Sequence, residues 1–322
     1  MKGLDIGRDF FLDWGLSFLK KEFPELTLRI SAGRFLGSDV IGADDKISRD
    51  HDWGPQFTLF LSEDDFCNLG NQLSERINRG APINWKGYRL EGADSYKKSV
   101  FIESVPRWIK KHYSFSKLPR SDEDWGLKVR EGQFVVIQED RESPLYFLKH
   151  GVLWLSNNDE LNQWRKALEY YPKNVWYGRL SQECFNIWHY GEYNFVQRIS
   201  KRGDPITLHL CLGEFVKGVM RIQFLLKKDY TPYWKWLAYE FRKLDCAQHY
   251  IPLLESLLRS DNIDKKIEIV KLICHDIHQQ ILSTRLISGK GAKEYAKYLL
   301  PLLNDHDEFL QLILNSKNRI RR

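Results

Sequence analysis

The chain has 322 residues, of which 43% are hydrophobic and 29% charged, a composition typical of a folded globular protein with room for two domains. Its 11 Trp, 15 Tyr and 18 Phe exclude a disordered chain. A net charge of +6 suits an anionic ligand such as a nucleotide, but is too small to indicate nucleic-acid binding alone. Five scattered cysteines, no apolar run long enough to span a membrane and no signal-peptide pattern favour a reduced, cytoplasmic protein.

The first part of the chain alternates between helical and extended patterns. Apolar residues at helical spacing predict a helix over about 5–23, which Pro24 ends. Alternation over 26–30 predicts a short strand, and a turn over 33–38 follows it. The apolar run 57–61 predicts a second strand.

The next elements complete a predicted sheet with helices. Ser62 is a suitable N-cap for a helix to about Asn78, and residues 98–103 predict a third strand. Two apolar segments, 133–137 and 151–155, fit either a strand or a buried helix.

After residue 157 helical periods dominate, most clearly over 208–226. The pattern predicts an α+β fold, with a mixed sheet and helices over 1–156 and a helical bundle over 157–322.

The most informative motif pairs Gly37-Ser38 with Asp50-x-Asp52, and eleven residues separate the two parts. A Gly-Ser turn can present backbone N–H groups and a hydroxyl to phosphate oxygens. Carboxylates at i and i+2 of a strand point to the same face, so both can bind one Mg²⁺. The Gly-Ser pair alone is typical of a turn, and the two aspartates alone are typical of surface charges. Together they predict the transfer of a nucleotide from a triphosphate donor.

Other polar residues stand close to this motif in the sequence. Arg34 and Arg49 could contact phosphate oxygens, and an ordinary surface role fits them equally well. His51 lies between the two aspartates, so on a regular strand it faces the opposite way and is expected to pack, not to bind metal.

The order and spacing of these residues resemble the DNA polymerase β-type nucleotidyltransferase superfamily, including its small bacterial aminoglycoside and lincosamide nucleotidyltransferases. The run Ser48–Pro55 resembles more closely an uncharacterised bacterial nucleotidyltransferase-like family, as do Gly191–Asn194 with Arg198 and Tyr230–Trp236. The resemblance implies a mixed sheet that carries the metal site and a helical domain that closes one side of the cleft. It does not imply a particular acceptor.

The resemblance also implies a mechanism. Ser38 and nearby amides would hold the β- and γ-phosphates of an NTP, while Asp50 and Asp52 would bind Mg²⁺. An acceptor hydroxyl would attack the α-phosphorus, and pyrophosphate would leave.

A third carboxylate, on a later strand, belongs to the pattern of the superfamily as a metal ligand and general base. Glu103 is the best-placed candidate, with Glu91 and Asp94 as alternatives. If none of them reaches the site, a binding-only protein becomes the better interpretation.

The helical half is expected to contact the acceptor. The candidate residues are Tyr193, Asn194, Arg198, Asp204, Glu214 and Lys235. Asp204 is also a candidate base for the acceptor hydroxyl. Glu214 shares one helix face with Lys217 and Arg221, and a solvated face explains these three slightly better than a substrate site.

Three functions therefore remain open. The first is Mg²⁺-dependent transfer of a nucleoside monophosphate to a hydroxyl of a small molecule. The second is a catalytically degenerate nucleotide-binding or interaction protein. The third is a toxin/antitoxin-type nucleotidyltransferase acting on RNA or protein, for which the spacing of Arg242 and His249 is the only signal. The absence of a long basic stripe disfavours nucleic acid as a partner.

Overall fold

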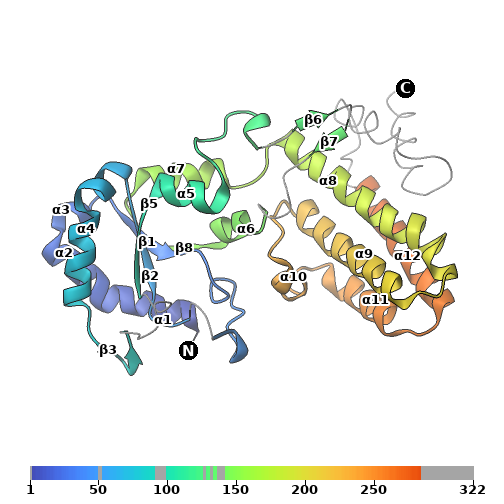
Figure 1. The fold of residues 1–322 in the computed structure, drawn as a ribbon, viewed down its shortest axis with the longest axis horizontal. Helices are drawn as coiled ribbons and strands as arrows, with labels where there is room; N and C mark the ends of the chain where they lie inside the picture. The colour runs from blue at the N-terminus through green and yellow to red at the C-terminus, as the bar shows by residue number, and fades with distance from the viewer. Residues whose placement is uncertain are drawn as a thin grey trace. The chain divides into compact units, whose positions relative to one another are not determined.

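The computed structural model describes residues 2–49, 53–90, 99–125, 128–130, 133–135 and 142–283. The chain divides into two compact units, one of Met1–Pro119 with Glu139–Glu169 and the other of Arg120–Gln138 with Tyr170–Arg322 (Figure 1). The functional boundary between residues 156 and 157 and the roles given to the two halves stay predictions.

The first unit contains a four-stranded mixed sheet in the order β5-β2-β1-β8. These strands are β1 (Ser31–Arg34), β2 (Phe57–Leu61), β5 (Val100–Ser104) and β8 (Val152–Ser156). Strand β1 is antiparallel to β2 and β8, whereas β2 is parallel to β5. Because β1 and β2 run in opposite directions, the end of β1 and the start of β2 lie at the same edge of the sheet.

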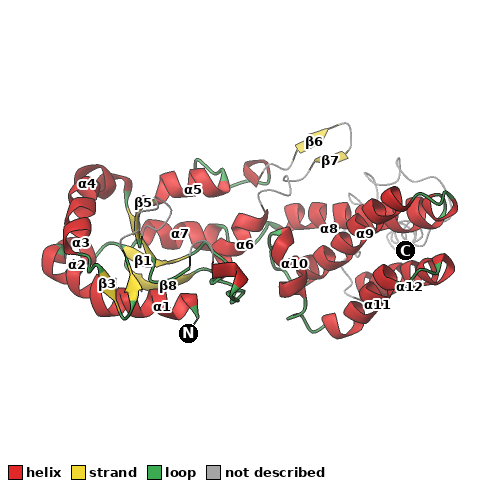
Figure 2. Cartoon of the chain, turned by 60° about the horizontal axis from the view of Figure 1, so that its bottom comes forward, coloured by secondary structure: helices red, strands yellow, loops and turns green. Residues whose placement is uncertain are grey.

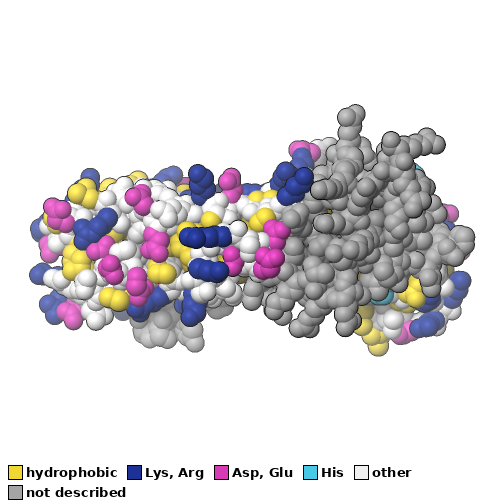
Figure 3. All heavy atoms as spheres, turned by 90° about the horizontal axis from the view of Figure 1, so that it is seen from above, with side chains coloured by type: hydrophobic (Ala, Val, Ile, Leu, Met, Phe, Trp, Pro, Cys, Tyr) yellow, Lys and Arg dark blue, Asp and Glu magenta, His cyan; other side chains and the backbone are white. Residues whose placement is uncertain are grey.

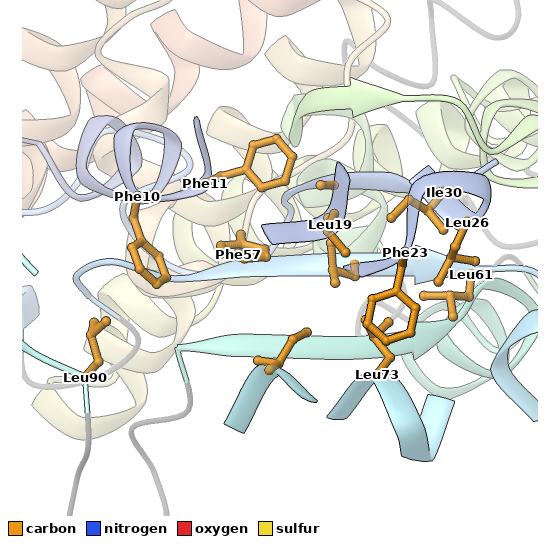
Figure 4. Packing of buried hydrophobic residues seen from close by; sticks show 13 residues of the cluster. Phe10, Phe11, Leu19, Phe23, Leu26, Ile30, Phe57, Leu61, Leu73 and Leu90 are labelled. Carbon is orange, nitrogen blue, oxygen red and sulfur yellow. The ribbon is translucent and has the colours of Figure 1, made fainter. Parts of the chain in front are cut away.

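One face of this sheet packs against N-terminal helices and α4. The helices are α1 (Gly3–Phe10), a π-helical turn (Phe11–Gly15), α2 (Leu16–Glu22), α3 (Pro24–Thr27) and α4 (Glu63–Gly80). Their buried side chains, among them Phe10, Leu19 and Leu73, join Phe57 and Leu61 of β2 in one hydrophobic core (Figure 4). Removal of this apolar surface from water is the main force that holds the layers together.

The opposite face carries aromatic contacts to α5 (Val105–Tyr113). The ring of Phe60, on β2, lies 4.7 Å from Trp108 and 5.3 Å from Phe35, measured between ring centroids. Helices α6 (Glu142–His150) and α7 (Asp159–Ala167) also belong to this unit, and β3 (Asn84–Trp85) pairs with β4 (Tyr88–Arg89). Figure 2 shows the strands of the sheet with helices on both sides.

The second unit is mainly helical, apart from the hairpin of β6 (Lys128–Arg130) and β7 (Gln133–Val135). Its helices are α8 (Lys173–Trp188), the π-helix η5 (His189–Val196), the 3₁₀ turn η6 (Ile199–Lys201), α9 (Pro205–Leu226), α10 (Trp234–Phe241), α11 (Ala247–Arg259) and α12 (Ile263–Ser283). Helix α9 packs against α8 and η5. None of the helices among the described residues is long and apolar enough to cross a membrane.

The α+β architecture with its later helical region is confirmed, and one predicted strand is wrong. Residues 24–27 form helix α3, and the strand begins only at Ser31. Pro24 occupies a first-turn position where its missing N–H costs nothing, and the Thr27 hydroxyl donates to the Phe23 carbonyl oxygen at 2.9 Å. Both ambiguous segments contribute strands, β7 and β8.

Candidate functional site

The turn after β1 depends on glycine at position 37. Gly37 has a φ of +115°, which L-residues rarely adopt. A Cβ there would lie 2.5 Å from Oδ1 of Asp39 and 3.1 Å from Nη2 of Arg34. The backbone of Gly37 therefore passes so close to a buried carboxylate and guanidinium that no other residue fits without displacement.

Ser38 connects the two halves of the predicted motif. Its hydroxyl donates to the carbonyl oxygen of Ser48 at 3.4 Å, two residues before Asp50. Among the described residues, none accepts a hydrogen bond from the backbone N–H of Gly37 or Ser38. Two adjacent, half-buried N–H groups without an acceptor among the described residues suit an anionic oxygen.

Arg34 and Asp39 form a buried ion pair beneath this turn. Nε of Arg34 lies 3.3 Å from Oδ2 of Asp39, and the two side chains are 7% and 2% exposed. Burial raises the pKa of the Asp39 carboxyl, and the Arg34 charge partly opposes this shift. Arg34 therefore supports the turn, whereas the predicted contact to a phosphate stays a prediction.

The far end of the same loop is held against the start of α1. The backbone N–H of Gly3 donates to Oδ2 of Asp44 at 2.7 Å, and Nε of Arg49 donates to the Asp44 carbonyl oxygen at 3.4 Å. The guanidinium of Arg49 also stacks over Trp53, 4.5 Å from the ring centroid. These contacts fix the residues on both sides of Asp50-His51-Asp52.

Asp50, His51 and Asp52 lie outside the described residues, as do the alternative carboxylates Glu91 and Asp94. Within the described ranges, no group of three or more His, Cys, Asp or Glu side chains could hold a metal ion. The predicted three-carboxylate metal site thus stays a prediction.

Glu103 lines a cavity of about 160 Å³ on the sheet face next to α5. In the parallel pair it stands opposite Phe60, one residue before β5 ends. The apolar wall is formed by Phe35, Leu36, Phe101 and Trp108, and the polar side chains are Arg34, Thr58, Glu103, Lys111 and His112. Glu103 and Arg34, both predicted from the sequence, therefore share one cavity.

Three lining residues, Thr58, Lys111 and His112, were not predicted from the sequence. Thr58 is the one polar residue of β2, and its position on the face opposite Phe57 and Leu59 follows from strand alternation. Helix α5 could have been found from Ser104, whose hydroxyl caps the N–H of Arg107, followed by Pro106 in the first turn. Burial, reinforced by Lys111, lowers the pKa of His112.

Tyr193, Asn194 and Arg198 come together in the second unit. Tyr193 and Asn194 lie on the π-helix η5, a type of helix that often marks functional sites. The Arg198 guanidinium stacks on the Tyr193 ring at 3.6 Å and donates to the Tyr193 carbonyl oxygen at 2.6 Å. Asn194 hydrogen-bonds His189 at 3.0 Å. Their substrate role stays a prediction.

The other candidates of the helical half lie apart from that group in the sequence and have local partners. Asp204 caps α9 by accepting from the N–H groups of Ile206 and Thr207, each at 3.2 Å. Glu214 pairs with Lys217 at 3.3 Å, and Lys235 is exposed with its ammonium over Trp236. The hydrogen bond from the Thr207 hydroxyl lowers the pKa of Asp204, which makes this carboxylate a weaker base.

Residues 139–237 match a family described as a domain of unknown function, DUF4037. This segment contains all six residues predicted to contact the acceptor, but neither Gly37-Ser38 nor Asp50-x-Asp52. No curated protein matches the chain.

One solved structure is similar over most of the chain. It is the crystal structure of a nucleotidyltransferase-like protein from Exiguobacterium sibiricum 255-15, with 11% sequence identity and a TM-score of 0.39. The alignment covers 95% of this chain and 89% of that one. At this TM-score the likeness does not establish a shared fold.

Proposed function

We propose that the protein transfers a nucleoside monophosphate from an NTP to a hydroxyl of a small molecule in a Mg²⁺-dependent reaction. The observation that carries the proposal is the Gly37-Ser38 turn, which follows β1 and is hydrogen-bonded to Ser48 at the start of the Asp50-x-Asp52 segment. An anion-binding turn and a pair of carboxylates at the start of a strand are the two parts that nucleotidyl transfer requires.

The carboxylates predicted for this site would suit the proposed metal. Glu103 presents a carboxylate to the cavity, and Asp50 and Asp52 are two further carboxylates in the sequence. Hard oxygen ligands of this kind are those that Mg²⁺ prefers. When bound, Mg²⁺ would neutralise charge on the phosphates during transfer.

The chain's own residues would perform the remaining tasks. The N–H groups of Gly37 and Ser38 would bind phosphate oxygens, in a turn held in place by the Arg34–Asp39 pair. Apolar walls such as Phe101 and Trp108 would limit water beside Glu103, whose carboxylate would accept the proton of the acceptor hydroxyl.

The described part of one face favours a small-molecule acceptor over a nucleic acid. Among the described residues on the face seen in Figure 3, Lys and Arg side chains are interspersed with Asp and Glu and form no single basic stripe. Non-specific binding to a phosphate backbone requires clustered positive charge.

A pyrophosphate-release assay with Mg²⁺, each of the four NTPs and a pool of hydroxylated acceptors tests the proposal. We expect release with the wild type and its loss in Asp50→Asn and Asp52→Asn variants that retain the wild-type circular dichroism spectrum. Equal release by the variants would contradict the site assignment. Binding of Mg²⁺-NTP without any release would instead support the degenerate, binding-only protein.

A further inference from the structure

The cavity beside Glu103 is too small for a whole nucleotide. Its volume of about 160 Å³ compares with roughly 300–1,000 Å³ for pockets that enclose complete small-molecule ligands. It can hold a compact polar compound or one group of a larger one. Its position next to the Glu103 carboxylate is where an acceptor hydroxyl would lose its proton.

The charges around this cavity are arranged for a ligand with two different polar groups. The charge of Arg34 is countered by Asp39, 3.3 Å away. The other charged side chains of the lining are Glu103 on β5 and Lys111 on α5. No ion pair joins Lys111 to a described residue. A hydroxyl can donate to Glu103 while an anionic group accepts from Lys111.

Two neutral side chains complete the polar lining. Thr58 on β2 and His112 on α5 can each donate or accept a hydrogen bond. Together with Lys111, they can donate to an oxygen-rich anion such as a phosphate or carboxylate.

The position of Lys111 has a simple alternative explanation. Basic residues are favoured in the last turn of a helix because they interact with its dipole, and α5 ends with Lys110, Lys111 and His112. The dipole accounts equally for both lysines, yet only Lys111 lines the cavity. Both lysines are exposed, and Lys110 serves as the matched control because it does not line the cavity.

We propose that this cavity is the acceptor site and that the acceptor is a small hydroxyl compound carrying an anionic group, bound by Lys111. The inference rests on the proposed nucleotidyl transfer. The acceptor oxygen forms a bond to the α-phosphorus, the bond from that phosphorus to pyrophosphate breaks, and the hydroxyl proton passes to Glu103.

The first test compares acceptors that differ in charge. Pyrophosphate release is measured with glycerol 3-phosphate and glycerate as anionic compounds, glycerol as a neutral one and choline as a cationic one. We expect turnover with an anionic compound, with KM raised about tenfold or more in Lys111→Met, unchanged in Lys110→Met and largely restored in Lys111→Arg. Equal effects of the Met substitutions, or better turnover of glycerol or choline, would overturn the inference and leave the proposed transfer intact.

The second test is independent of turnover. Binding of glycerol 3-phosphate and glycerate is measured by calorimetry without nucleotide, in the wild type, Lys111→Met and Lys110→Met. Loss of binding only in Lys111→Met supports the anion site, even if no acceptor is ever turned over and the proposed transfer fails. No binding of either compound to the wild type, or equal binding to all three proteins, would overturn it.

Discussion

At the scale of single residues, the loop after β1 is defined by close approaches. Gly37 lies against the buried Arg34–Asp39 pair, and Gly3 donates to Asp44 from the start of α1. A Cβ on Gly3 would lie 2.7 Å from Cδ1 of Trp53. These contacts place the backbone before any ligand binds, so the turn needs little reorganisation to receive a phosphate.

Replacement of Gly37 by Ala tests this packing. We expect Gly37→Ala to lower the free energy of unfolding by about 1–3 kcal/mol from backbone strain, with a further loss from contact with Asp39. Gly87→Ala is the control, because Gly87 also has a positive φ of +86° but no atom within 4 Å of its added Cβ. Urea unfolding of both variants measures the difference, and equal losses would show that the close approach is unimportant.

The Arg34–Asp39 pair gives a prediction about pH. Removal of Arg34 leaves a buried carboxylate without this cation, so Arg34→Met should cost about 3–5 kcal/mol near pH 7. Burial already raises the pKa of Asp39, and the loss of Arg34 would raise it further. The Arg34→Met variant should therefore gain folding stability as the pH falls through that pKa and lose it as the pH rises.

Urea unfolding between pH 7 and pH 4 measures the effect. The cost of Arg34→Met should shrink on acidification, and in the double variant Arg34→Met/Asp39→Asn that trend should vanish. A cost independent of pH would contradict the assignment to Asp39.

At the scale of elements, two substitutions of Asp204 distinguish a capping role from a catalytic one. Asp204→Ala should destabilise the protein by about 1 kcal/mol, because α9 loses its N-cap, whereas Asp204→Asn should keep most of the cap. Thermal unfolding and pyrophosphate release are measured together. We expect Asp204→Asn to retain activity, and a stable but inactive Asp204→Asn would support the predicted base instead.

Much of the element pattern could be predicted from the sequence because burial imposes it. The run 57–61 and the N-cap Ser62 became β2 and the start of α4, and the helical period of 208–226 became α9. The strand predicted over residues 26–30 was wrong because a single helical turn also places Leu26 and Ile30 in the core and leaves Leu28 exposed.

The site could be predicted only where its residues form a local motif. Gly37 and Ser38 are recognisable as neighbours, and Glu103 ends a strand pattern. Lys111 and His112 reach the cavity only because α5 packs against β5, which is a tertiary contact without a local signal.

At the scale of the whole molecule, ligand binding should affect the two units differently. The turn, Glu103 and the cavity all belong to the first unit, whereas the π-helix η5 belongs to the second. We expect saturating Mg²⁺-ATP to slow amide hydrogen exchange over residues 35–49 and in β5, since a ligand stabilises the state that binds it. Exchange in the middle of α9 should change less. Protection confined to the second unit would contradict the assignment of the nucleotide to the Gly37-Ser38 turn.

The most direct test of nucleotidyl transfer at this site is the transfer of α-labelled phosphate from ATP to an acceptor by wild type, Glu103→Gln and Glu75→Gln. Glu75 is an exposed carboxylate on α4 and serves as the control. The loss of a general base should lower the transfer rate of Glu103→Gln by about a hundredfold to ten-thousandfold, with Glu75→Gln unchanged. Equal rates for all three proteins would contradict the account.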